Sequence, residues 1–295
     1  MHVRQRQSTG VPGLDELLGG GLLPGTLTVV AGATGIGKTQ LGVQFAQAGL
    51  AQEGERGIVF DMASRGDAQN HAAYALRMFN WPLEAADPAK PPPFDGFFAA
   101  ECPRFDYLHV FDDRGQRVTR RDMGVEAWHD WQAEIATKLA VTIGFFYGAF
   151  VRGARRAVVD GVEPVERPSE SIQFELFEYI YHQILRKESE WVARDLFREH
   201  YRSQAAAAAA AIYDARSIGC LLLVTTREIM LDELIERRLD EGDVLSNANT
   251  VIYMGKTRSG RTLGRGLYVA KHRGSASSDE IVPYAINDAG LSITV

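Results

Sequence analysis

Short apolar runs alternate with helical patterns along most of the chain. Five apolar runs bounded by turn residues predict buried strands, at residues 26–31, 56–62, 107–111, 157–161 and 220–226. Apolar residues three or four positions apart predict helices between them, at residues 40–52, 67–79 and 125–150. Strands that alternate with helices are typical of a mostly parallel sheet with helices on its faces. The pattern therefore predicts an α/β fold.

The last quarter of the chain has a different pattern. Four β-type runs follow one another with only turn residues between them, at 250–254, 263–271, 281–286 and 291–295. Strands joined by such short turns pair antiparallel. We expect them to extend the parallel sheet with antiparallel C-terminal strands.

Two segments depart from the regular alternation. Residues 83–97 contain Pro88 and three consecutive prolines, 91–93, which predicts a loop with little freedom to form a strand or helix. A helical pattern from 169 to 217 is longer than the core needs, and it includes an alanine run at 205–211. We expect a helical insertion at about 170–215, an extended pair of helices that projects from the core. Its predicted apolar stripe consists of Tyr181, Leu185, Val192 and Leu196.

Length and composition favour one domain over residues 1–295. The 295 residues are 45% apolar, enough for a substantial core, and the longest apolar run, 139–151, is too short to span a bilayer. Cys102 and Cys220 are far apart and lack metal-ligand spacing, so neither a disulfide framework nor a zinc site is indicated. Without a signal-peptide pattern, we expect a cytoplasmic protein with no membrane association.

Residues 32–39 match the phosphate-binding pattern G-x-x-x-x-G-K followed by Ser or Thr at every fixed position. A strand precedes this stretch and a helix follows it, so backbone N–H groups and a helix N-terminus surround one small volume suited to a nucleotide phosphate. Lys38 would reach the β- and γ-phosphates of ATP, and the Thr39 hydroxyl would bind Mg²⁺. The predicted cofactor-binding residues are Gly32, Ala33, Thr34, Gly35, Ile36, Gly37, Lys38, Thr39 and Gln40.

Asp160 comes near the end of the apolar run 157–161. A buried strand that delivers a carboxylate to the C-terminal edge of a parallel sheet, beside the phosphate loop, can hold Mg²⁺ through water or the Thr39 hydroxyl. Many strands end in Asp without such a role. Given the phosphate loop upstream, we predict that Asp160 and Thr39 form the metal site.

The segment before the phosphate loop carries a family signature. Residues 9–21, Thr-Gly-Val-Pro-Gly-Leu-Asp-Glu-Leu-Leu-Gly-Gly-Gly, followed by the phosphate loop, resemble the opening of the KaiC and RadA branch of the RecA-like ATPases. The resemblance covers residues 8–82 and about 100–295. It implies a RecA-like core and Mg-ATP as cofactor, and we expect one such ATPase core in this chain. Thr226 lies where the family's Thr-Thr-Glu strand end can sense the γ-phosphate, although helix capping is an equal alternative.

Lys271-His272-Arg273-Gly274 matches the K-x-R-G pattern of KaiC-like proteins. Strand alternation places Lys271 and Arg273 on one side. The resemblance implies that both act catalytically, with Lys38 and Asp160, by reaching ATP bound to the neighbouring subunit. It therefore implies a homo-oligomer, a ring of six subunits or a filament, with nucleotide between protomers. The alternative is a solvated basic strand end.

One family feature is missing from the chain. RecA-like proteins take the carboxylate that activates water from a Glu after the second strand, but here Ala63, or Ala63 and Ser64, occupy that position. Loss of a catalytic base costs about 10²- to 10⁴-fold in rate. Asp61, Asp67 or Glu163 could replace it, each without precedent in the pattern. We expect Mg-ATP binding with slow hydrolysis.

Two functions fit these observations. The first is a KaiC-type oligomeric regulator or scaffold controlled by nucleotide, and the second is a RadA-like accessory ATPase of DNA recombination or repair. The net charge of −6 favours the first. An arginine stripe, Arg194, Arg198 and Arg202, favours the second, although it could instead contact a protein partner, a neighbouring subunit or only solvent. Salt-dependent binding to single-stranded DNA would separate them.

Overall fold

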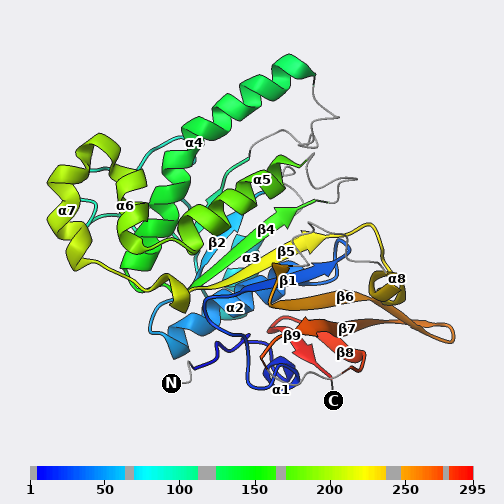
Figure 1. The fold of residues 1–295 in the computed structure, drawn as a ribbon. Helices are drawn as coiled ribbons and strands as arrows, with labels where there is room; N and C mark the ends of the chain where they lie inside the picture. Colours follow the sequence, from blue (N-terminus) through cyan, green and yellow to red (C-terminus); the bar gives the residue numbers. More distant parts are fainter. Residues whose placement is uncertain are drawn as a thin grey trace.

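The fold is centred on one large sheet (Figure 1). The computed structural model describes residues 5–63, 70–111, 124–163, 171–236, 247–274 and 279–294. Within them, nine strands follow the order β3-β2-β4-β5-β1-β6-β7-β8-β9. Their bounds are β1 Leu27–Gly32, β2 Ile58–Asp61, β3 Tyr107–His109, β4 Arg156–Val162, β5 Gly219–Thr225, β6 Thr250–Ser259, β7 Thr262–His272, β8 Val282–Asn287 and β9 Gly290–Ile293.

Strand direction divides the sheet into two parts. Each pair from β3 to β6 is parallel, and each pair from β6 to β9 is antiparallel. Both the parallel core and the antiparallel C-terminal extension were predicted, so the expected fold class is confirmed. The ends of β1, β2, β4 and β5 lie at one edge of the sheet, because parallel strands run in the same direction.

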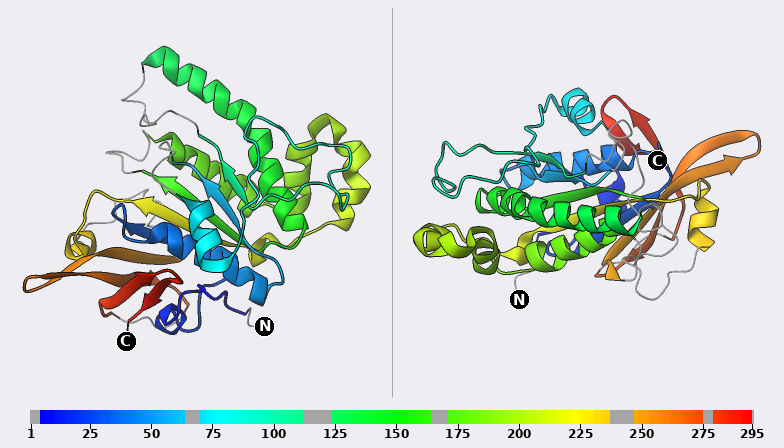
Figure 2. Two further views of the ribbon diagram at one scale, coloured as in Figure 1. Left: turned by 180° about the vertical axis from the view of Figure 1, so that it is seen from behind. Right: turned by 90° about the horizontal axis from the view of Figure 1, so that it is seen from above.

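Helices cover both faces of the sheet, because strand residues alternate between two separate apolar clusters. One cluster contains Val30, Val59 and Val158 together with the N-terminal segment and α2 and α3, and the other contains Val29, Phe60 and Val159 together with α4 to α7. In the left view of Figure 2, α3 lies on the face of the sheet that is turned toward the reader. The helix bounds are α1 Leu14–Leu17, α2 Lys38–Gln52, α3 His71–Phe79, α4 Val125–Val151 and α8 Leu231–Glu236.

The segment expected to be helical after residue 170 is helical, but its shape differs from the prediction. It contains α5 (Ile172–Tyr179), a π-helical turn (Ile180–Leu185), α6 (Ser189–Phe197) and α7 (Tyr201–Ala210). Instead of an extended projecting pair, α6 packs on α4 and α7 packs on α6. Leu185, Val192 and Leu196 are buried there, while Tyr181 is partly buried.

The predicted arginine stripe does not lie on one continuous helix. Arg198 has a positive φ of 46° and separates α6 from the helical turn that precedes α7. Such a φ is uncommon for a residue with a side chain, and it changes the direction of the chain. Arg194 is instead held by Glu190, with Nη2 2.6 Å from Oε1. Arg194, Arg198 and Arg202 therefore do not form one continuous basic stripe along a helix.

Residues 83–97 form a loop, as predicted. The loop runs along α4, and Pro92 lies directly against Gly144, where a Cβ would collide with the proline ring. Ala85 makes an isolated bridge to Tyr107 at the edge of the sheet. The glycine in α4 thus allows the proline loop to approach the helix closely.

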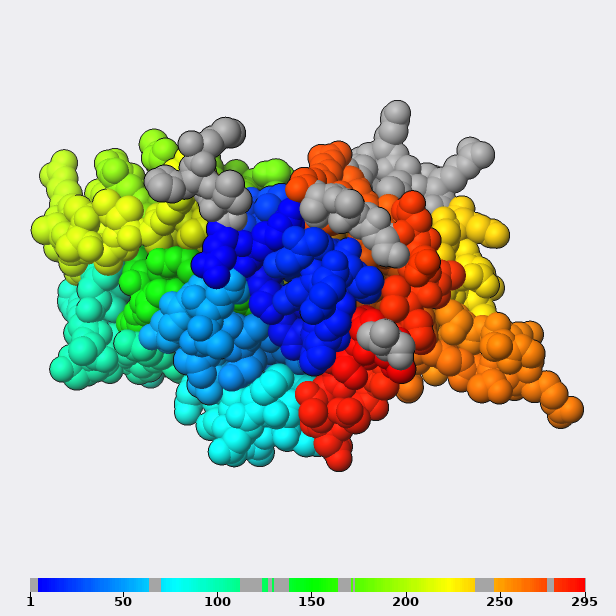
Figure 3. Space-filling model, turned by 90° about the horizontal axis from the view of Figure 1, so that it is seen from below, coloured from blue at the N-terminus to red at the C-terminus, as the bar shows by residue number. Residues whose placement is uncertain are grey.

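The N-terminal segment lies beside the C-terminal strands (Figure 3). The backbone N–H of Ile293 donates to the Pro12 carbonyl, and Asp15 accepts from Thr9 N–H at 2.7 Å and from the hydroxyls of Ser8 and Thr9. The residues of the family signature thus hold this segment in place. In the described part of the chain, no helix combines the length and apolar character needed to cross a bilayer.

Candidate functional site

The phosphate loop joins β1 to α2 at the edge where the parallel strands end. Gly35 and Gly37 have φ values of 76° and 104°, which residues with side chains rarely adopt. A Cβ on Gly37 would also lie 2.7 Å from Ile286 Cδ1 in β8. Tyr284, in the same strand, donates its hydroxyl to the Ile36 carbonyl at 2.7 Å. The antiparallel extension therefore supports the loop, a role that no local sequence pattern indicated.

Lys38 begins α2 and turns its side chain back into the loop. Its Nζ donates to the carbonyls of Gly32 and Ala33, each at 2.9 Å, and the residue is only 6% exposed. Burial lowers the pKa of the ammonium group to about 8, although the negative charge of Asp160 opposes this shift. The structure thus places one partly desolvated cation inside the curve of the loop.

Thr39 and Asp160 meet across the sheet edge. The Thr39 hydroxyl donates to Asp160 Oδ2 at 2.9 Å, although Thr39 lies in α2, which follows β1, and β5 separates β1 from β4, the strand of Asp160. A hydroxyl and a carboxylate are oxygen ligands of the kind that Mg²⁺ prefers. The donor set therefore fits Mg²⁺, and the open loop with its buried cation fits a phosphate chain. These residues are brought together as the sequence predicted.

His71, which the sequence analysis did not identify, lies between two buried carboxylates. Its Nε2 is 3.0 Å from Asp160 Oδ2, and its Nδ1 is 3.5 Å from Asp61 Oδ2. Asp61 also accepts a hydrogen bond from the Tyr107 hydroxyl at 2.7 Å. Register explains the arrangement, because Asp61 pairs with Asp160 in neighbouring parallel strands while His71 starts α3. The matching strand-end positions of Asp61 and Asp160 were the available signal for this cluster.

The charges of the cluster shift the pKa values of its members. Burial alone would lower the pKa of His71, but the hydrogen bond to Asp160 and the charges of both carboxylates raise it overall. Burial raises the pKa of Asp61 above its usual value. For Asp160 burial acts in the same direction, but its contacts with His71, Lys38 and Thr39 outweigh burial and lower the pKa. The arrangement favours an ionised Asp160 with a cationic neighbour.

Ala63 lies just beyond β2, where the family's glutamate was expected. It is 4% exposed, its N–H donates to Asp61 Oδ1, and its carbonyl contacts His109 Nε2 at 2.8 Å. Of the three possible replacement carboxylates, Asp61 is a member of the cluster around His71. Glu163 follows β4 and donates its N–H to Gln173 Oε1. Asp67, like Ser64, lies outside the described residues.

Gln40 and Thr226 both lie close to the phosphate loop. A Cβ on Gly37 would be 3.5 Å from Gln40 Oε1, so this side chain lies against the loop. Thr226 follows β5, and its N–H donates to the Gly32 carbonyl at 3.0 Å. Its hydroxyl donates to the Glu228 carbonyl at 3.1 Å, and Thr226 lies five positions before Leu231, the first residue of α8, which is too far for an N-cap. The capping alternative for Thr226 is therefore wrong, while the sensor role stays a prediction.

Lys271 and Arg273 lie away from the phosphate loop of their own chain. Lys271 pairs with Val251 in β6, and Val251 pairs with Val29 near the start of β1, whereas the loop follows Gly32. Lys271 therefore lies level with Val29, three residues before Gly32, which is about 10 Å along the strand from the start of the loop. Burial and the nearby charge of Arg273 lower the pKa of Lys271. The structure therefore does not bring this pair to the site that contains Lys38 and Asp160.

Comparisons with known proteins point to one group of ATPases. Residues 7–87 match a family model described as ATPase: KaiC. Over 97% of the chain, the sequence is 25% identical to circadian clock protein KaiC2 of Synechocystis, of which it spans 39%. A 54-residue stretch is 46% identical to a UPF0273 protein of Methanopyrus kandleri, and it covers 18% of this chain and 21% of that protein. The chain thus spans well under half of these curated relatives.

A solved structure has the same fold. The crystal structure of a KaiC-like protein from Pyrococcus horikoshii aligns with a TM-score of 0.51 and 17% identity, covering 99% of this chain and 100% of that one. At this level of identity the match supports the fold alone.

Proposed function

We propose that this KaiC-like P-loop ATPase of the RecA superfamily binds Mg-ATP and acts as an oligomeric, nucleotide-dependent regulator or scaffold with slow hydrolysis. The contact between the Thr39 hydroxyl and Asp160 carries this proposal. It joins the start of α2, which follows β1, to a buried carboxylate of β4, two strands away from β1 in the sheet. This arrangement is suited to holding the metal of a metal-nucleotide complex.

Each residue of the site has a proposed task. The backbone N–H groups of residues 32–39 and the Lys38 ammonium hold the phosphate chain, while Gln40 lies against the loop. Thr39 and Asp160 hold Mg²⁺, which when bound neutralises charge on the β- and γ-phosphates. Thr226 stays a candidate sensor of the γ-phosphate, because its backbone N–H donates a hydrogen bond to the carbonyl of Gly32 at the beginning of the loop.

Slow hydrolysis follows from the side chain at position 63. A methyl group cannot orient or deprotonate water. Ala63 is also buried, with its N–H bonded to the Asp61 side chain and its carbonyl in contact with His109 Nε2. Asp61 is the best-placed carboxylate, but Tyr107, His71 and the Ala63 N–H already surround it. We propose that it organises the cluster and that water activation is left weak. A weak base keeps ATP bound for longer, which suits a switch better than a motor.

Steady-state ATP turnover tests this proposal. We expect Ala63→Glu to raise the turnover of the native protein by about tenfold or more, because a well-placed base contributes about 10²- to 10⁴-fold. Ala63→Gln is the matched control, since it has the same length but cannot accept a proton, and Lys38→Ala gives the background rate. The rate is followed by release of inorganic phosphate at saturating Mg-ATP.

Brisk turnover of the native protein, unchanged in Ala63→Glu and lost in Lys38→Ala, would contradict slow hydrolysis. Asp61→Asn and Glu163→Gln would then identify the carboxylate that replaces the glutamate. Absence of Mg-ATP binding by the native protein would contradict the proposal as a whole.

We propose that Lys271 and Arg273 act on the nucleotide of a neighbouring subunit. Their position about 10 Å along the sheet from their own phosphate loop supports action in trans. A closed ring, of six subunits by family resemblance, would bring one protomer's β7 to the next protomer's loop.

Mixing two impaired variants tests action in trans. Lys38→Ala lacks the loop cation and Arg273→Ala lacks the proposed finger, so each alone should be inactive. In mixed oligomers, a subunit with Lys38 can meet a neighbour with Arg273, and we expect about a quarter of the interfaces to regain the native rate. If the two variants are monomeric, or do not exchange subunits, the mixture should show no recovery of ATP turnover. Recovery absent from freely exchanging oligomers would contradict the proposal.

DNA binding receives no specific support from the structure. The predicted arginine stripe is interrupted at Arg198, and Arg194 pairs with Glu190. A protein partner at α6 and α7 remains a prediction. The free thiols of Cys102 and Cys220 fit the proposed reducing, cytoplasmic location.

A further inference from the structure

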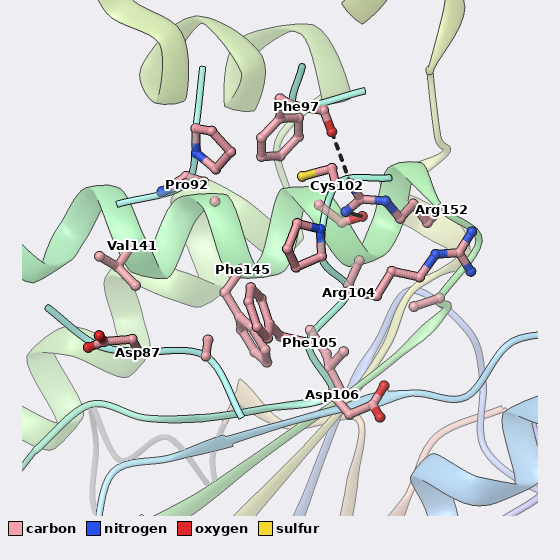
Figure 4. A pocket seen from close by; sticks show the side chains of 18 of the residues that line it. Asp87, Pro92, Phe97, Cys102, Arg104, Phe105, Asp106, Val141, Phe145 and Arg152 are labelled. Atoms are coloured by element: carbon pink, nitrogen blue, oxygen red, sulfur yellow. Dashed lines mark hydrogen bonds between the residues drawn. The ribbon is translucent and has the colours of Figure 1, made fainter. Parts of the chain in front are cut away.

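A cavity of about 490 Å³ lies away from the nucleotide site, between α4 and residues 86–106 (Figure 4). Ile58, the first residue of β2, lines it, whereas Asp61 at the other end of the same strand belongs to the cluster around His71. The cavity therefore lies toward the opposite edge of the sheet from the phosphate loop. Its volume falls within the range of about 300–1,000 Å³ that is typical of small-molecule sites.

Apolar and aromatic side chains form most of the wall, namely Pro92, Phe97, Phe105, Val141 and Phe145, with the Cys102 thiol beside them. The wall is held in place from several directions. Pro92 presses against the bare backbone of Gly144, and the Arg152 Nη2 group donates to the Phe97 carbonyl at 2.9 Å. Phe97 also stacks on Tyr147, with ring centroids 5.8 Å apart. A rigid proline loop and a packed helix thus give a preformed cavity.

Charged side chains at the cavity favour an anionic group. Arg104 and Arg152 lie on the same side of the view in Figure 4. The carboxylates there already accept hydrogen bonds, Asp106 from Trp81 Nε1 and Asp87 from the Ala89 N–H, each at 2.9 Å. Arg104 is 61% exposed, and its Nη1 lies 3.5 Å from Oε1 of Glu55, which also lines the cavity. This contact is long and leaves other N–H groups of the guanidinium able to bind a second anion.

We propose that this cavity binds a small molecule with a flat apolar ring system and one acidic group. The rings would pack against Phe97, Phe105 and Phe145, since aromatic rings favour offset or edge contacts with one another. The acidic group would meet Arg104 at the rim. The proposal is independent of the nucleotide site and goes beyond the function proposed above.

Two fluorescent probes separate the apolar and acidic parts of this recognition. The probe 1-anilinonaphthalene-8-sulfonate has a flat ring system and one anionic group, and N-phenyl-1-naphthylamine has the same ring types without the charge. Titration of the native protein with the sulfonate is expected to show one saturable site with a dissociation constant of about 1–100 μM. Lys38→Ala should bind it equally well, because the nucleotide site is not involved.

Filling the cavity should remove the site. Ala149 lines the cavity from α4 and is only partly buried, so Ala149→Phe is expected to weaken binding of both probes by about tenfold or more. Ala72→Phe adds the same ring on the exposed side of α3 and should change nothing. Phe105→Ala is a second test with little risk to folding, because this ring is 39% exposed, and it should weaken both probes by about threefold to tenfold.

Removing the rim charge should affect only the anionic probe. We expect Arg104→Gln to weaken the sulfonate by about twofold to fivefold and to leave the neutral probe unchanged. Arg77→Gln, an exposed arginine that pairs with Asp288, is the matched control. Sulfonate binding that persists unchanged in both Ala149→Phe and Phe105→Ala, with native melting temperatures, would overturn the site. Equal effects of Arg104→Gln on the two probes would overturn the acidic group.

Discussion

Arg156→Met is expected to lower the free energy of unfolding by about 3–5 kcal/mol, the usual cost of removing one partner from a buried ion pair. Arg156 is fully buried at the start of β4 and pairs with Glu53, with Nε 2.7 Å from Oε2. Its guanidinium also donates to the carbonyls of Ser8 and Phe45 and to the Gln52 side chain. Methionine fills much of the volume but leaves these acceptors without a donor.

Urea unfolding followed by circular dichroism measures the loss, and Arg216→Met is the matched control. Arg216 is 76% exposed and pairs with Asp214 at 3.0 Å, so its removal should change the free energy of unfolding far less than the loss of Arg156. Glu53→Gln should have an intermediate effect, because an amide can still accept from the guanidinium and Glu53 is partly solvated. Equal stability of Arg156→Met and the native protein would show that the network contributes nothing net.

Local periodicity was sufficient to predict most of the fold. The strands β1, β4 and β5 are continuous apolar runs because both faces of the sheet are covered, and the helices between them showed their spacing clearly. The bend at Arg198 was not predictable in the same way. Arg198 adopts its positive φ between α6, which packs on α4, and α7, which packs on α6, and nothing in the local sequence marks it.

The site was predictable where its residues are neighbours in sequence. Residues 32–39 match one contiguous pattern between β1 and α2. Asp160 lies in an apolar strand, a weak signal alone, and was predicted because the phosphate loop and the family resemblance accompany it. His71 was not found, because its role depends on how α3 is placed over the ends of β2 and β4. Arg156 was missed for a similar reason, since its partners Glu53, Ser8 and Phe45 come from other segments.

His71→Ala is expected to destabilise the nucleotide-free protein by about 3–5 kcal/mol, because it leaves two buried carboxylates facing one another without the imidazole between them. The side chains of Asp61 and Asp160 are 4% and 1% exposed, so solvent can do little to separate their charges. Millimolar Mg²⁺ without nucleotide should restore part of the melting temperature, because a bound cation would compensate the same charges. The native protein should respond less to Mg²⁺.

A second substitution distinguishes charge repulsion from a simple packing defect. In the His71→Ala background, Asp61→Asn removes one of the two facing charges but keeps the size of the side chain. It should therefore recover stability without Mg²⁺, and it should reduce the Mg²⁺ effect. His182→Ala, at an exposed histidine of the π-helical turn, controls for loss of an imidazole alone. If the double variant is no more stable than His71→Ala, the carboxylates do not repel one another there, and His71 acts mainly by filling space between β2, β4 and α3.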